Sequence, residues 1–230
     1  FDHPDPANVQ YPVMVAALLK LAEEKEADNA VREGKTRASE AGDATEVVSI
    51  LERMLVWVDY SSIPQRSEAT LKLAIQSLSA YSSLAAEFVI VAPTCHHLQT
   101  GAVCDFESYR RRAWCRAEQL SHFLKNGTSF MWVAAAEDAI RPHDKLAQTS
   151  LVGGSETTHD FLDIFAGDAT VETDKLDLVM PLLGLYAVLL AERTHSERSD
   201  DSESFTASPK APVLAAAAPA AAALVSASAM

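Results

Sequence analysis

Three short, wholly apolar runs limit the folds that this chain can adopt. They are LVWVD at 55–59, EFVIVAP at 87–93 and SFMWVAA at 129–135. Amphipathic segments with helical spacing separate these runs, as at 68–85. Strands that are apolar on both faces and alternate with helices are typical of a parallel sheet covered by helices on both sides. We therefore predict an α/β fold.

The remaining sequence divides the chain into three parts. Residues 1–136 are expected to form the α/β domain, with a polar, mobile insertion at about 26–45. Residues 137–195 are expected to form a helical extension that packs on this domain. Residues 196–230 are of low complexity, so we predict a disordered tail.

Composition excludes several partners and places the chain in the cytoplasm. A formal net charge of −13 repels phosphate backbones, so no nucleic acid partner is expected. The longest apolar run, 178–190, has 13 residues against the ~20 of a membrane span, so no membrane partner is expected either. Three cysteines without C-x-x-C spacing indicate reduced thiols. The chain begins at Phe1 rather than at methionine, and we expect its natural N-terminus upstream.

The segment YRRRAWCRAEQLSHFL at 109–124 predicts one helix that opens with Arg110, Arg111 and Arg112. Cations are unfavourable at a helix N-terminus, by roughly 0.3 to 1 kcal/mol each. Two explanations remain open. The arginines bind an anion, such as a phosphate or a partner's acidic face, or Asp105 and Glu107 neutralise them on the surface.

Helical projection of this segment places Glu118 beside an aromatic ring. Ala113, Ala117, Leu120 and Leu124 share the sector that faces the core, while Trp114, Glu118 and Ser121 lie on its flank. Glu118 is therefore expected to be semi-exposed. It is either a carboxylate with a usable or raised pKa or a solvated residue that pairs with Arg111 or His122.

No metal site is expected. Cys95, His96, His97 and Cys104 carry zinc-ligating groups, but adjacent histidines rarely reach one ion and paired ligand spacing is missing. The sequence also contains no serine nucleophile elbow, phosphate-binding glycine loop or dinucleotide-binding glycine motif.

Three segments together resemble the TIR (Toll-type receptor) domain family, specifically its divergent protist members. They are VWVDYSSIPQ, LAIQSLSAYSSLAAEFVIVAP and AWCRAEQLSHFLKNGTSFMWVAA, and the last contains the motif W-C-x-x-E. The resemblance covers about residues 9–136. It implies a flavodoxin-like parallel sheet whose first strand precedes Phe1.

The resemblance also implies a chemistry. Catalytic members of the family release nicotinamide from NAD, and their catalytic glutamate falls on Glu118. A carboxylate there would stabilise the ribosyl oxocarbenium. Trp114 and Asp59 would shape the site, and Arg111 and Arg112 would face the pyrophosphate. NAD would be a substrate, and no cofactor is expected.

Three functions follow as hypotheses. The first is an intracellular signalling domain with NAD glycohydrolase activity. The second is a non-catalytic module that binds its own kind or other TIR-like proteins. The third is a nucleoside deoxyribosyltransferase-like enzyme. The enzymes require Glu118 to be open to a pocket, whereas the interaction module tolerates a glutamate tied to arginine.

Overall fold

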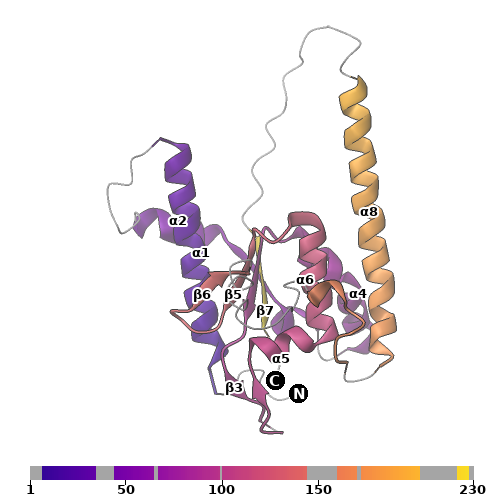
Figure 1. The fold of residues 1–230 in the computed structure, drawn as a ribbon. Coiled ribbons are helices and arrows are strands. Elements are labelled where there is room, and N and C mark those ends of the chain that lie inside the picture. Colours follow the sequence, from indigo (N-terminus) through magenta and orange to yellow (C-terminus); the bar gives the residue numbers. More distant parts are fainter. Residues whose placement is uncertain are drawn as a thin grey trace, which may run out of the picture.

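The computed structural model describes residues 7–34, 44–64, 67–98, 100–143, 160–169, 172–202 and 222–227. Its centre is a five-stranded sheet in the order β1-β7-β2-β5-β6 (Figure 1). The strands are β1 (Leu55–Val58), β2 (Glu87–Val91), β5 (Met131–Ala134), β6 (Ile140–Pro142) and β7 (Ala222–Ala227).

The three predicted strands are confirmed as β1, β2 and β5. β2 pairs with β5 in parallel, as expected. The sheet is nevertheless mixed, because β6 runs antiparallel to β5. The chain from β5 to β6 is only a short turn, and such a turn can join antiparallel neighbours but not parallel ones.

Strand β7 comes from the segment for which the sequence predicts disorder. It lies between β1 and β2 and is parallel to both. Backbone hydrogen bonds on both sides stabilise a strand whatever its side chains, and composition does not report that contribution. The predicted tail at 196–230 is therefore wrong for 222–227, while 203–221 and 228–230 lie outside the described residues.

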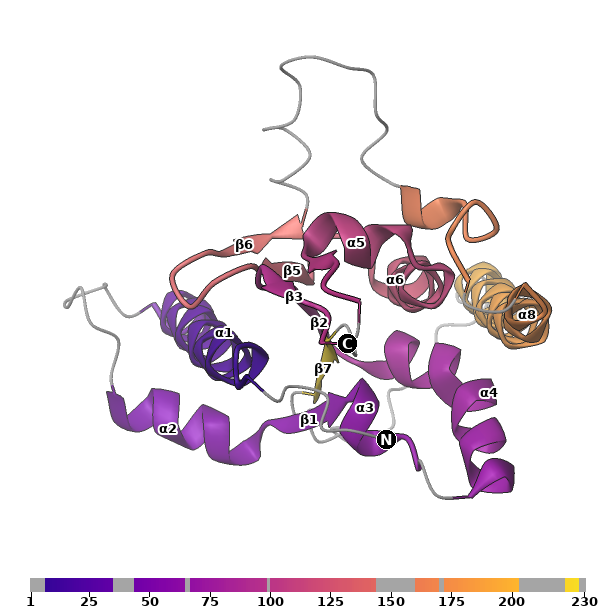
Figure 2. The same cartoon turned by 90° about the horizontal axis from the view of Figure 1, so that it is seen from below.

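Two helices cover one face of the sheet. α1 (Gln10–Arg32) packs Val13, Ala17 and Leu21 against the alternate strand residues Val89, Val91 and Ala134. α2 (Ala44–Arg53) lies beside α1, as Figure 2 shows. The polar insertion predicted at about 26–45 is too long, because α1 continues to Arg32. Residues 35–43 lie outside the described part of the chain.

The other face is covered by α4 (Glu68–Leu84), α5 (Phe106–Arg111) and α6 (Ala113–Asn126). The core here joins Phe88, Ile90, Met131 and Val133 of the strands to residues of these helices. Ser67 caps α4 by accepting a hydrogen bond from the Thr70 N–H. The single turn α3 (Asp59–Ser62) follows β1 directly.

The C-terminal extension contains a short 3₁₀ helix, η1 (Asp160–Leu162), and the long helix α8 (Asp174–Ser202). Both pack against α6, and α8 also packs against α4. α8 continues through 196–202, where the sequence predicts disorder. Across the described ranges, the structure contains no helix with the length and apolar character of a membrane span.

A buried carboxylate, that of Glu87, connects helix α1 to strands β2 and β5. Glu87, at the start of β2, accepts hydrogen bonds from Lys25 of α1 at 2.7 Å and from the Trp132 indole of β5 at 2.9 Å. Each carboxylate oxygen therefore has a partner, which a buried charge requires.

Gly167 gives a test of how the extension packs. A Cβ at this position would lie 2.8 Å from the backbone nitrogen and Cα of Ala113. We expect Gly167→Ala to lower the free energy of unfolding by about 1–3 kcal/mol, since backbone atoms cannot move aside cheaply. Urea denaturation measures this change.

Gly184 of α8 is the matched control, because a Cβ there meets nothing within 4 Å. Gly184→Ala should raise the free energy of unfolding by up to ~1 kcal/mol, through helix propensity. Equal effects of the two substitutions would contradict the close approach of residue 167 to α6.

Candidate functional site

The arginine-rich segment forms two helices, so the prediction of one helix over 109–124 is wrong. α5 ends at Arg111, Arg112 has extended backbone angles, and α6 begins at Ala113. Arg110 and Arg111 therefore occupy the last turn of α5, where the helix dipole favours cations. The unfavourable interaction with the helix dipole that the sequence suggested is therefore absent for Arg110 and Arg111, because they lie at the end of a helix and not at its start.

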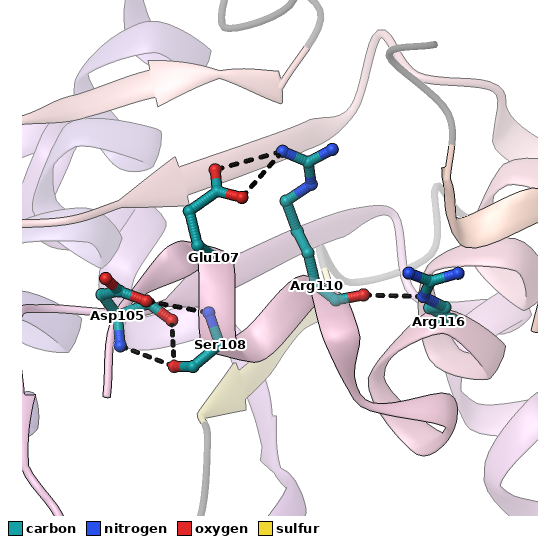
Figure 3. Close-up of polar contacts among 5 residues, drawn as sticks. All are labelled: Asp105, Glu107, Ser108, Arg110 and Arg116. Atoms are coloured by element: carbon teal, nitrogen blue, oxygen red, sulfur yellow. Dashed lines mark hydrogen bonds and ion pairs between the residues drawn. The ribbon is translucent and has the colours of Figure 1, made fainter. Parts of the chain in front are cut away.

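The two acidic residues at the start of α5, Asp105 and Glu107, make different contacts (Figure 3). Asp105 accepts a hydrogen bond from the Ser108 N–H at 2.8 Å, and the Ser108 hydroxyl lies 2.7 Å from the Asp105 N–H. This reciprocal pair is a capping box. Glu107 forms an ion pair with Arg110 at 3.1 Å. Of the two acidic residues expected to neutralise the arginines, Glu107 pairs with Arg110, whereas Asp105 caps α5.

Backbone contacts hold the break between α5 and α6 in place. The Ala113 N–H donates to the Asp168 carbonyl at 2.8 Å, and the Asp168 N–H donates to the Arg111 carbonyl. The Arg116 side chain adds two bonds, to the Arg110 carbonyl at 2.7 Å and to the Asp163 carbonyl at 2.8 Å. The extension thus fixes the backbone that carries Arg112.

A charge cluster forms around Arg112, and we define it as Asp59, Arg112, Cys115 and Glu118. Cys115 and Glu118 are buried, whereas Asp59 and Arg112 are half-buried. The pKa of Arg112 is raised. The charge interaction with the neighbouring Cys115 side chain contributes most, and the carboxylates of Glu118 and Asp59 add to it, while burial acts in the opposite direction. Burial raises the pKa of Asp59, while Arg112 lowers it. Structure therefore brings together three residues that the sequence assigned to the site: Asp59, Arg112 and Glu118.

Glu118 is almost inaccessible to solvent. Its exposed fraction is 3%, so the prediction of a semi-exposed carboxylate is wrong. α6 is buried on two sides: Cys115 packs into the core on the sheet, while Ala113 and Ala117 pack against Ile164 and Leu178 of the extension. The helical projection predicted one buried side of α6, because the sequence does not reveal that the extension covers a second side.

The remaining predicted site residues lie apart from this cluster. Trp114 packs with the residues that contact the extension, so it supports α6 on the side of α8. Arg111 is exposed at the end of α5.

A cavity of about 260 Å³ opens beside β1, α3 and the first four turns of α4. Its walls include Trp57 and Tyr81, whose rings stack at 5.7 Å between centroids, together with the hydroxyls of Ser62, Thr70 and Ser77. None of its lining residues belongs to α6. Glu118 therefore does not face this cavity.

The residues considered for zinc lie on a hairpin of β3 (Cys95–His96) and β4 (Val103–Cys104). Cys95 and Cys104 are directly opposite each other in its ladder. In the part of the chain that the structure describes, no three histidine, cysteine, aspartate or glutamate side chains gather where they could hold a metal ion.

Two polar residues, on α5 and α6, are buried in a way that the sequence did not predict. His122 is fully buried, its Nδ1 lies 3.1 Å from the Ser82 carbonyl oxygen, and burial lowers its pKa. Tyr109 is also fully buried and contributes to the charge environment of Arg112. The signal in the sequence was the spacing of Cys115 and His122, seven residues apart on one side of α6.

Comparison with protein families, curated proteins and solved structures finds no match to this chain.

The three cysteines should differ strongly in reactivity. Cys115 is 5% exposed and burial raises its pKa to about 12, whereas Cys95 and Cys104 are partly exposed. The thiolate is the reactive form, so at pH 8 we expect two thiols of the folded protein to react with a disulfide reagent such as Ellman's reagent.

The third thiol should react only after denaturation, and Cys115→Ser should leave the count in the folded protein at two. A third thiol that reacts at the rate of the others under native conditions would contradict the burial of Cys115.

Proposed function

We propose that this chain is a non-catalytic protein-interaction module of the TIR-like kind, in which Glu118 is a structural partner of Arg112. The observation that carries this proposal is the burial of Glu118, at 3% exposed, beside an arginine whose pKa it raises. Arg112 is half-buried. A charge that is partly removed from water needs an anionic neighbour, because without one it destabilises the fold.

The requirements of catalysis argue in the same direction. Nicotinamide release needs a carboxylate within reach of the ribose carbon as positive charge develops there. The cavity of about 260 Å³ is lined from β1, α3, α4 and the loop between them, not from α6. A deoxyribosyltransferase-like reaction needs the same access to a carboxylate, so the argument applies to it as well.

The topology supports the flavodoxin-like part of the proposal. In flavodoxin-like folds the first strand of the chain lies between the second and third. Here β7 takes that place, between β1 and β2, and is parallel to both.

An interaction module also needs a surface, and exposed apolar residues supply one. Leu73, Tyr81 and Leu84 of α4 are exposed, and so is Leu55 of the edge strand β1. The homotypic partner and the signalling role belong to the same proposal and rest on the TIR-like resemblance.

NAD glycohydrolase activity remains the second candidate, because one observation favours it. Asp59 follows β1 directly and belongs to the charge cluster with Arg112 and Glu118, and burial raises its pKa. Buried carboxylates with shifted pKa values at the carboxyl end of a parallel strand are common at active sites.

The test is nicotinamide release from NAD by concentrated, folded protein, with Glu118→Gln as the variant. We expect no release from either protein. We also expect Glu118→Gln to lower the free energy of unfolding by about 3 kcal/mol, because Arg112 loses a charged partner.

Glu107→Gln is the matched control, since Glu107 pairs with Arg110 at 3.1 Å while its side chain is 69% exposed. Its loss should cost less than ~1 kcal/mol. Release by the wild-type protein that disappears in Glu118→Gln, but not in Glu107→Gln, would overturn the proposal in favour of the enzyme.

A further inference from the structure

Two of the three cysteines face each other across the hairpin of β3 and β4. Cys95 and Cys104 are directly opposite in its antiparallel ladder, and both are thiols. The Cys95 sulfur lies 3.8 Å from the Cys104 carbonyl oxygen, so it is close to the backbone of the opposite strand. Both side chains are half-buried, which leaves them accessible to a small reagent. The register of the hairpin thus brings two thiols together on one side of it.

The turn of the hairpin fixes this register. The His97 N–H donates to the Ala102 carbonyl at 2.8 Å, and the Gly101 N–H donates to the His97 carbonyl at 2.8 Å. Gly101 has a φ of 69°, a left-handed conformation that glycine adopts without strain. Turn geometry sets which residues of a hairpin are opposite, and a shift by one residue would move every side chain to the other face. The two cysteines are therefore held in place as neighbours.

The geometry of this position allows a disulfide that is easily reduced. Pairs in an antiparallel ladder alternate between two types, and the cysteine pair is two residues away from the hydrogen-bonded pair of His97 and Ala102. Cys95 and Cys104 are therefore of the same type, with Cα atoms about 5.5 Å apart, within the roughly 4.4–6.8 Å that disulfides span. Their Cβ atoms are roughly 1 Å farther apart than in a disulfide. Bond formation has to draw the strands together, and such a bond is more readily reduced.

The hairpin joins the sheet to the helix that precedes Arg112. It lies between β2 and α5 in the chain, and Cys104 directly precedes Asp105, the cap of α5. β4 packs against α5, and Figure 1 shows β3 beside the same helix. A bond across the hairpin fixes the segment that leads into α5.

We propose that Cys95 and Cys104 form a redox-active dithiol that low-molecular-weight disulfides oxidise reversibly to an intramolecular disulfide. The thiolate of one cysteine attacks the small disulfide, which releases one small thiol and leaves a mixed disulfide on the protein. The thiolate of the other cysteine then attacks the mixed disulfide, forms the bond between residues 95 and 104 and releases the second small thiol. Each released thiol takes the proton that a cysteine has lost. The protein loses two electrons, and the small disulfide gains them.

The experiment treats the folded full chain with oxidised glutathione at about pH 8, where thiolates form. Remaining thiols are then alkylated, and the peptides are mapped by mass spectrometry. We expect Cys95 and Cys104 to be linked within one chain, with no glutathione attached. Cys104→Ser should instead retain glutathione on Cys95, because the second thiol is missing. Glutathione that stays on the wild-type chain, links between chains only, or two unreacted thiols would overturn the inference.

Cys115→Ser is the matched control, because Cys115 is 5% exposed and lies in the core on α6. This variant should form the same disulfide as the wild type. Failure of Cys115→Ser to form it, in a sample that is folded, would overturn the assignment of the dithiol to the hairpin.

Reversal of the reaction tests the proposed ease of reduction. We expect an excess of reduced glutathione to restore both thiols in the folded protein, whereas the structural disulfides of secreted proteins resist the glutathione pool. Ellman's reagent counts the thiols, and the number that react should fall from two to none on oxidation and return to two. A disulfide that persists in excess reduced glutathione would overturn the reversible part of the proposal.

Discussion

The ionisation of Arg112 is the constraint on which the candidate site depends. A guanidinium keeps its charge under all ordinary conditions, so the fold must place anions beside it wherever it is buried. Here Asp59 from the end of β1 and Glu118 from α6 meet that need. The same contacts join the first strand of the sheet to the helix that crosses its face. The cluster therefore links the end of β1 to the start of α6, which lies far from it in the sequence.

Arg112 can reach these carboxylates only because the chain breaks there. Residue 112 leaves helical geometry, and the extension holds the break through the backbone of Arg111, Ala113 and Asp168. The close approach of Gly167 to Ala113 makes that contact possible. Residues after 160 are thus part of the site, although none of them carries its chemistry.

The sequence predicts the parts of the fold that local patterns determine. Apolar runs locate β1, β2 and β5. Sequence patterns predict the structure wrongly where a contact with a distant segment determines it. The break at Arg112 depends on Asp168, the second buried side of α6 depends on the extension, and β7 depends on pairing with β1 and β2. Each of these requires a contact across more than 40 residues, which periodicity does not report.

We propose that the main role of Glu118 is to neutralise the charge of Arg112. The most direct test is a double-mutant cycle of Arg112→Met and Glu118→Gln, with the free energy of unfolding of all four proteins measured in urea. We predict a coupling of about 1–3 kcal/mol, because the second substitution removes a charge that the first has left without its partner. Additive effects within ~0.5 kcal/mol would show that the two side chains do not depend on each other, and would contradict the account.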